Sequence, residues 1–166
     1  MPSSNWFKNA VIDQILIDRF AGYTKISNKP EFLGGNLRGI IQKMDYLNNL
    51  GIHAILLSPF YETHQYHGYH ITDYKKVDPR FGNIDDLKIL IAEAHKRNIR
   101  VIADFVPNHC SRYHPFFKEA QADQNSPYCR WFYFKRWPHD YLCFLDVSDL
   151  PKLNLDNPDT REYILD

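Results

Sequence analysis

A carboxylate, an amide and an imidazole lie within six residues, directly after a predicted buried strand. The strand is the apolar run Arg100–Ala103, and Asp104, Asn108 and His109 follow it. Pro107 lacks a backbone donor and stops the strand, so Asn108 and His109 begin a loop. Sheets of parallel strands place their binding and catalytic groups at the carboxyl ends of the strands. These three side chains are therefore the candidate site.

Each candidate also has an ordinary structural role. Asp104 could accept backbone N–H groups of the next loop or contact a ligand, and the sequence leaves both open. Asn108 is more simply a turn residue. His109 is favoured as a donor to a ligand, because it follows a strand-ending proline at the expected rim of the sheet. Tyr69, in a glycine-containing loop after another predicted strand, either covers the core or presents its ring to a ligand.

Two other groupings suggest chemistry that we do not predict. His64, His67 and His70 are spaced three residues apart. However, nothing fixes their loop as a helix, and no cysteine or acid nearby in the sequence completes a tetrahedral zinc set. Cys110 adjoins His109, but the thiol and base of a cysteine hydrolase meet through space rather than as neighbours in the sequence.

Composition limits the class of protein. The 166 residues carry 20 Lys+Arg and 20 Asp+Glu, so the formal net charge is zero. This balance argues against a nucleic-acid partner and against a polybasic membrane patch. No apolar run approaches the ~20 residues of a membrane span. The amino end lacks the basic start and the apolar block of a signal peptide, so we do not expect one. The widely spaced Cys110, Cys129 and Cys143 fit free thiols in a reducing compartment, so we expect a cytoplasmic protein.

Apolar runs predict three strands, over residues 11–17, 54–58 and 99–105. The connections between them are too long for hairpins, which favours parallel pairing with right-handed crossovers. The segment 60–81 is polar and aromatic and is expected to be a long loop.

Two helices are predicted between these strands. Asn36 is a candidate N-cap, apolar residues keep a three-and-four spacing as far as Leu50, and Gly51 suits the left-handed end of the helix. Asn83 and Asp86 are spaced like a capping pair and begin the second helix.

The resulting fold class is α/β, an incomplete TIM (β/α)8 barrel of which the chain supplies the first three β/α units. A complete barrel needs ~250 residues. We assign residues 1–105 to the barrel and residues 106–166 to an irregular inserted subdomain and the start of the return to the barrel. The aromatic run Trp131–Trp137 is most simply the core of that subdomain, with a ligand-binding rim as the alternative. A complete small α/β domain would expose unpaired edges of buried strands.

Six motifs, in order, resemble the catalytic domain of the α-amylase family (glycoside hydrolase family thirteen). They are Val11–Ile15 with Asp18–Phe20, Gly34–Leu37 with Gly39–Ile40, Leu47–Pro59, His67–Tyr69 with Asp73–Tyr74 and Val77–Gly82, Asp104–His109, and Leu150–Asn154. Their order and spacing match the family over nearly the whole chain.

This resemblance implies hydrolysis or transfer of α-linked glucosides with retention, on starch-like glucans or maltooligosaccharides. That chemistry needs a carboxylate nucleophile and an acid/base ~5–5.5 Å apart. By the family pattern, Tyr69 stacks on the sugar at the cleavage subsite and His109 hydrogen-bonds a hydroxyl of that sugar. Asp104 and Asn108 hold the corner together.

The chain departs from the family pattern in two ways. The family's three catalytic carboxylates lie on later strands, beyond Asp166, so no catalytic residue is assigned here and the chain alone is expected to be inactive. In calcium-containing members, the asparagine matching Asn108 also binds the ion. Calcium-containing members often have an acidic residue where this sequence has Lys152. A lysine adds positive charge and supplies no oxygen ligand for a hard cation. We therefore expect no metal or other cofactor.

Two functions therefore remain open. The first is an α-amylase-type glycosidase of which this chain is the front part. The second is a catalytically silent carbohydrate-binding or interaction module derived from the same fold. The presence of the three carboxylate motifs in the protein distinguishes them. The sequence predicts no oligomeric state.

Overall fold

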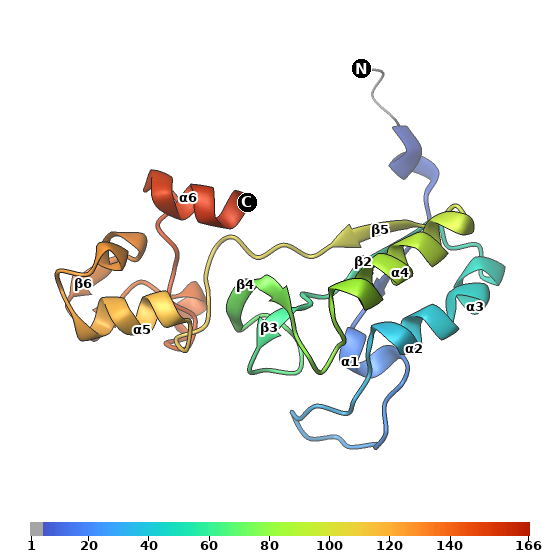
Figure 1. Cartoon of the computed structure of the whole chain (residues 1–166), viewed down its shortest axis with the longest axis horizontal. Helices are drawn as coiled ribbons and strands as arrows, with labels where there is room; N and C mark the ends of the chain where they lie inside the picture. The colour runs from blue at the N-terminus through green and yellow to red at the C-terminus, as the bar shows by residue number, and fades with distance from the viewer. Residues whose placement is uncertain (1–4) are drawn as a thin grey trace. The chain divides into compact units, whose positions relative to one another are not determined.

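The computed structural model describes residues 5–166, which form two compact units (Figure 1). The first unit contains the described residues up to Phe60 together with Lys76–Asp104. The second contains Tyr61–Lys75 and Phe105–Asp166. Each unit has its own apolar core. Over the described part of the chain, no helix combines the length and apolar character needed to cross a membrane.

The first unit is a three-stranded parallel sheet with helices. Its elements are η1 (Asn5–Asn9), β1 (Ile12–Ile15), α1 (Ile17–Phe20), α2 (Leu37–Gln42), α3 (Met44–Asn49), β2 (Ala54–Leu57), α4 (Ile84–Lys96) and β5 (Arg100–Ala103). The strand order is β1-β2-β5, and both pairs are parallel. The predicted α/β class, the parallel pairing and the three strands are confirmed, with each strand shorter than predicted.

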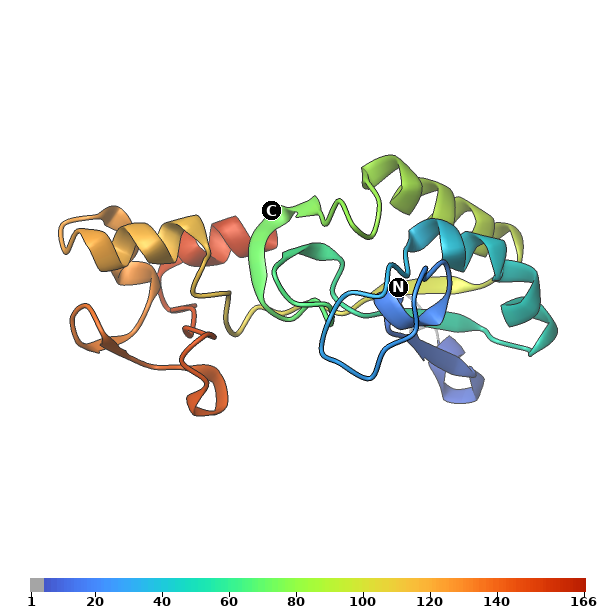
Figure 2. The same ribbon diagram turned by 90° about the horizontal axis from the view of Figure 1, so that it is seen from below.

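The register of the sheet aligns the carboxyl ends of its strands. Ile15 pairs with Leu57, and Leu57 pairs with Ala103. Asp104 directly follows this aligned edge, and its backbone N–H donates to the carbonyl of Leu57 at 3.0 Å. Within this unit α2 and α4 lie side by side (Figure 2). Their apolar faces share one buried cluster with β1 and β2.

The helix predicted from Asn36 to Leu50 is two helices, α2 and α3, which meet at Lys43. Lys43 has φ −99° and ψ 5°, and its N–H bonds back three residues to Ile40 rather than four. The departure of Lys43 from helical geometry does not change which residues face the core. Ile40, Met44 and Leu47, on both sides of the break, are all fully buried. The sequence pattern therefore carries no trace of the break.

The predicted helix ends are confirmed. The Asn36 side chain accepts the N–H of Gly39, and Gly51 has φ +76°, a left-handed geometry that glycine adopts without steric cost. At α4, Asn83 accepts the N–H of Asp86 while the Asp86 carboxylate accepts the N–H of Asn83. This is a complete capping box, with aspartate in the place usually taken by glutamate.

The prediction of a continuous loop over residues 60–81 is wrong. Two strands, β3 (Tyr61–Thr63) and β4 (Ile71–Val77), pair within it. Polar side chains support this pairing, because the Thr72 hydroxyl donates to the carbonyl of Glu62 and the Thr63 hydroxyl donates to that of His70. Threonine side chains look polar in the sequence, yet their β-branched shape suits a strand.

The second unit adds a helical and irregular segment to this β3–β4 pair. Its further elements are α5 (Pro115–Ala122), η2 (Pro127–Trp131), β6 (Phe134–Arg136), β7 (Asp140–Tyr141), η3 (Phe144–Asp146) and α6 (Pro158–Leu165). Aromatic rings dominate its core, as in the stack of Phe116 on Tyr128 with ring centroids 4.1 Å apart. Trp131 and Phe132 are buried in this core as predicted, whereas Trp137 is 38% exposed. The predicted domain boundary after residue 105 stays a prediction.

Acid is expected to destabilise the second unit through His114, the N-cap of α5. The ring is 3% exposed, its Nδ1 accepts the N–H of Phe116, and burial lowers the pKa of His114 to about 4. The unfolded chain, with a pKa of about 6.5, takes up the proton first as the pH falls. The stabilisation that comes from keeping His114 neutral is complete above pH 6.5 and is lost as the pH falls toward 4. When the pH falls from 7 to 5, this loss lowers the free energy of unfolding by about 2 kcal/mol.

Urea unfolding at several pH values measures this effect. His114→Asn keeps an N-cap acceptor but cannot titrate, so it should remove about 2 kcal/mol of the difference in stability between pH 7 and pH 5. His139→Asn, at an exposed position, is the matched control for replacing an imidazole by an amide, and it should keep the stability of the original chain at pH 7. An unaltered pH dependence in His114→Asn would show that this ring is not the group responsible.

Candidate functional site

Backbone pairing holds Asn108 and His109 against a second predicted motif. The N–H of Leu153 donates to the carbonyl of Asn108 at 2.9 Å, and His109 forms an antiparallel bridge with Lys152. The Tyr74 hydroxyl donates to the carbonyl of His109 at 2.5 Å from within the buried core. Two motifs that are distant in the sequence thus form one corner of the second unit.

The His109 ring has a protein partner at each nitrogen. Its Nδ1 lies 3.3 Å from Asn108 Nδ2, and its Nε2 lies 3.3 Å from the backbone carbonyl of Tyr69. An amide NH2 only donates and a carbonyl only accepts, so Nδ1 must be the acceptor and Nε2 must carry the hydrogen. The corner therefore fixes one neutral tautomer of His109, with its N–H directed at the Tyr69 backbone.

The surroundings of His109 favour this neutral form. The residue is only 4% exposed, and burial lowers its pKa, while the hydrogen bond to Tyr69 works in the opposite direction. Phe144 covers one face of the ring in a stacked arrangement, with centroids 4.8 Å apart. His109 is therefore a directed neutral donor near neutral pH, rather than a cation.

Tyr69 comes from the tight connection between β3 and β4. Gly68, at φ +87°, makes the turn, and the N–H of Tyr69 donates to His67 Nδ1 at 3.2 Å. The Tyr69 ring lies beside the His67 ring, with centroids 5.7 Å apart and planes tilted by 31°. Tyr69 is half-buried, so its ring is neither sealed in the core nor fully in solvent.

The structure brings together Tyr69, Asn108 and His109, three of the four predicted site residues. Asp104, the fourth, is half-buried at the end of β5 and belongs to the first unit. The proposed role of Asp104 in the corner therefore stays a prediction.

Sequence reasoning missed Phe144 and the segment around it. Phe144 is 40% exposed while it stacks on His109, and the next residue, Leu145, is 78% exposed with φ +48°. A non-glycine residue in this left-handed region carries strain, which is common near functional sites. A lone aromatic residue outside every motif gave no signal of its contact with His109.

The donor set at the corner does not fit calcium, which binds six to eight oxygens. The backbone carbonyl of Asn108 already accepts from Leu153, and Asn108 Nδ2 faces His109. Lys152 pairs with this strand and adds a positive charge rather than an oxygen. We therefore derive no step through calcium.

Cys110 is also unsuited to catalysis. The residue is fully buried, and burial raises the pKa of its thiol well above the usual range. Only the thiolate is a nucleophile. The arrangement of the second unit does not support a cysteine hydrolase.

These features define an α/β protein with a corner in which the directed imidazole donor of His109 contacts the backbone of Tyr69. The chain belongs to the α-amylase family, because residues 6–166 match that family's "Alpha amylase, catalytic domain". Alpha-amylase 2 of Dictyoglomus thermophilum is 46% identical over 164 residues, which cover 96% of this chain and 29% of that protein.

Solved structures agree in fold. A cyclomaltodextrinase superimposes with a TM-score of 0.89 at 34% identity, over 96% of this chain and 31% of its own. Cyclic alpha-maltosyl-(1-->6)-maltose hydrolase from Arthrobacter globiformis, in complex with that sugar, gives 0.90 at 32% identity, over 97% of this chain and 41% of its own. The chain thus spans well under half the length of each of these relatives.

Proposed function

We propose that these 166 residues are the front part of an α-amylase-family glycosidase, which cleaves α-glucosidic bonds of starch-like glucans or maltooligosaccharides with retention. The family match over residues 6–166 supports the enzyme class. The Arthrobacter relative in complex with a maltose-based sugar supports an α-glucan as the ligand. In this proposal, the sheet β1-β2-β5 is the beginning of a (β/α)8 barrel, and the later residues form a subdomain inserted after the third strand.

The pairing of His109 with Tyr69 carries the proposal. The contact of His109 Nε2 with the Tyr69 carbonyl, at 3.3 Å, is long for an N–H···O hydrogen bond. Hydrogen bonds in unliganded active sites are often long and tighten when substrate binds. A sugar hydroxyl beside Tyr69 can therefore accept the same N–H. The Tyr69 ring supplies a flat apolar surface for the sugar and a hydroxyl for a polar contact.

His109 does not perform the chemical step in this proposal. Retention requires a carboxylate nucleophile and a second carboxyl group as acid/base. By analogy with the family pattern, the proposal assigns both to later strands of the whole protein. Tyr69 and His109 instead bind and orient the sugar, and a donor aimed at a hydroxyl lowers the barrier if that bond strengthens in the transition state.

The isolated 166-residue chain is expected to show no hydrolysis of maltooligosaccharides, because it lacks the proposed nucleophile and acid/base. Release of reducing sugar measures this directly. Turnover that disappears in His109→Ala would contradict the proposal, since it would show a complete active site within these residues.

A chimaera tests the positive half of the proposal. Residues 1–166 replace the matching segment of Alpha-amylase 2 from Dictyoglomus thermophilum, which is 46% identical. The chimaera should hydrolyse a maltooligosaccharide on which the parent enzyme is active. A folded chimaera that binds the sugar without cleaving it would favour the silent carbohydrate-binding module.

A further inference from the structure

Three potential metal ligands converge in the second unit, apart from the Tyr69–His109 pair. His64, His70 and Asp149 each offer one ligand atom, and all three atoms lie within 4.8 Å of one another. All three residues are half-buried. His64 and His70 flank the turn between β3 and β4, whereas Asp149 precedes the motif that pairs with Asn108. No spacing pattern joins Asp149 to the two histidines, which lie about 80 residues earlier in the sequence.

We propose that His64, His70 and Asp149 form a binding site for a first-row divalent metal ion, with zinc the best fit. Imidazole nitrogens suit zinc and similar ions, which also accept a carboxylate oxygen, whereas calcium and magnesium prefer sites made of oxygen ligands. Zinc bonds of 2.0–2.1 Å place tetrahedral ligand atoms about 3.3 Å apart. The side chains therefore need to close by about 1.5 Å or less around the ion. Three protein ligands leave the fourth position for water.

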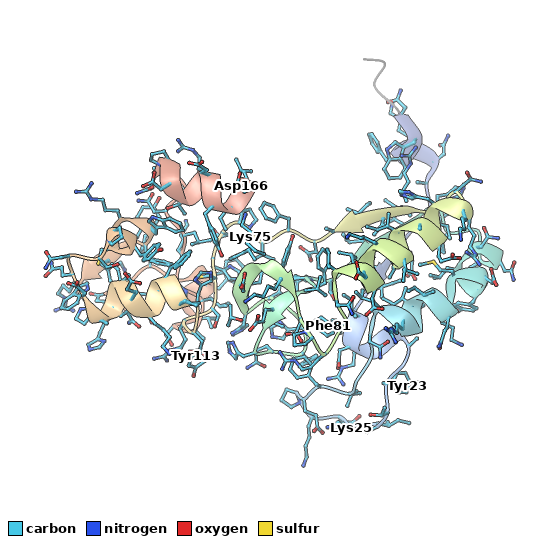
Figure 3. The ribbon with its side chains drawn as sticks, in the orientation of Figure 1. Tyr23, Lys25, Lys75, Phe81, Tyr113 and Asp166 are labelled. Carbon is cyan, nitrogen blue, oxygen red and sulfur yellow. The ribbon has the colours of Figure 1, made fainter. Side chains whose placement is uncertain are left out.

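The His64 ring is already oriented by a buried hydroxyl. Its Nδ1 lies 3.1 Å from Ser111 Oγ, and Ser111 is fully buried. Ser111 Oγ also accepts the N–H of Tyr113, which lies just before α5 and is labelled in Figure 3. The Tyr113 ring packs edge-on against His64, with centroids 4.9 Å apart. Metal-binding histidines typically use one ring nitrogen for such a contact and the other for the ion. The contact with Ser111 thus orients the His64 ring within the cluster.

His70 is half-buried beside the ring of His64, with ring centroids 4.8 Å apart. Its Nδ1 is buried and has no hydrogen-bond partner among residues 5–166. A buried ring nitrogen without a partner is unfavourable, and coordination is one way to satisfy it.

Asp149 is positioned from the opposite side. Arg112 Nη1 lies 3.2 Å from Asp149 Oδ1, and the N–H of Arg112 donates to the carbonyl of Asp149 at 2.8 Å. A carboxylate has about four acceptor positions, so one contact with arginine leaves oxygen sites for an ion. Arg112 fixes the carboxylate beside the two histidines while it lowers the affinity for a second cation.

Titration of the 166-residue chain with Zn²⁺ by calorimetry, and with Co²⁺ by visible absorption, tests this proposal. We expect one ion per chain and Co²⁺ bands of low-coordinate geometry. His64→Ala, His70→Ala and Asp149→Asn should each weaken binding by roughly 10–100-fold or more, since even partners outside the ligand set contribute that much. His139→Ala, at an exposed position in the same unit, should bind as the original chain does.

Several results would overturn the metal site. One is the absence of saturable binding, and another is unchanged affinity in the His64→Ala/His70→Ala double variant. A third is equal binding in concentrated urea, which would show that the ion needs no folded site. Asp149→Asn preserves the size of the side chain, so it remains informative if a histidine variant unfolds. The readout is independent of glycosidase activity, so the metal site and the proposed function can fail separately.

Discussion

Replacing Asp18 by alanine is expected to lower the free energy of unfolding of the first unit by about 3–5 kcal/mol. The carboxylate is 1% exposed and accepts the N–H of Leu33 on both oxygens, at 3.0 and 2.9 Å, and that of Gly34 at 3.0 Å. Arg19 Nη1 lies 3.3 Å from the same group. Removing Asp18 takes this acceptor away from the N–H groups of Leu33 and Gly34 and from the Arg19 guanidinium. Buried donors that lose their acceptor lower the stability of the folded state.

Urea unfolding followed by circular dichroism measures the loss. Asp18→Asn keeps one oxygen but replaces the other by a donor, so its stability should lie between those of Asp18→Ala and the original chain. Asp45→Ala is the matched control, because Asp45 forms a surface ion pair with Arg97 and its side chain is 81% exposed. That pair should contribute no more than about 1 kcal/mol. A similar small loss for Asp18→Ala would show that the loop at Leu33 does not depend on the carboxylate.

Local signals in the sequence predicted much of the first unit. Apolar runs marked β1, β2 and β5, and the types of Asn36, Asn83 and Asp86 marked the helix ends. Each of these features depends on residues within a few positions of one another, which is the range over which a sequence pattern carries information.

The remaining features depend on contacts between distant residues. The strands β3 and β4 lack an alternating apolar pattern. Their pairing is supported instead by hydrogen bonds from the hydroxyls of Thr63 and Thr72 to backbone carbonyls. The stacking of Phe144 on His109 and the approach of Asp149 to His64 likewise arise only from the fold of the second unit. No spacing rule reaches across such separations. At the candidate site, the residue types came from the sequence, and the tautomer of His109 came from the structure.

Replacing His109 by alanine in the active chimaera is expected to lower kcat/KM for a maltooligosaccharide by up to about 10²-fold, the loss of one transition-state hydrogen bond. The variant removes the Nε2 donor, and it also releases the Tyr69 carbonyl that this nitrogen holds at 3.3 Å. His109→Gln separates the two roles, because its amide can still donate. Partial recovery of kcat in His109→Gln would indicate a directed donor rather than mere filling of space.

The measurement that tests the central claim most directly is kcat/KM of the chimaera carrying His109→Ala, beside the same chimaera carrying His139→Ala. Both variants lose an imidazole from the second unit, but His139 is exposed and lies outside the corner. The proposal predicts a loss of up to about 10²-fold in the first variant, with unchanged folding by circular dichroism, and no loss in the second. An unchanged kcat/KM in His109→Ala would remove His109 from the glucan site and contradict the proposed role of this corner.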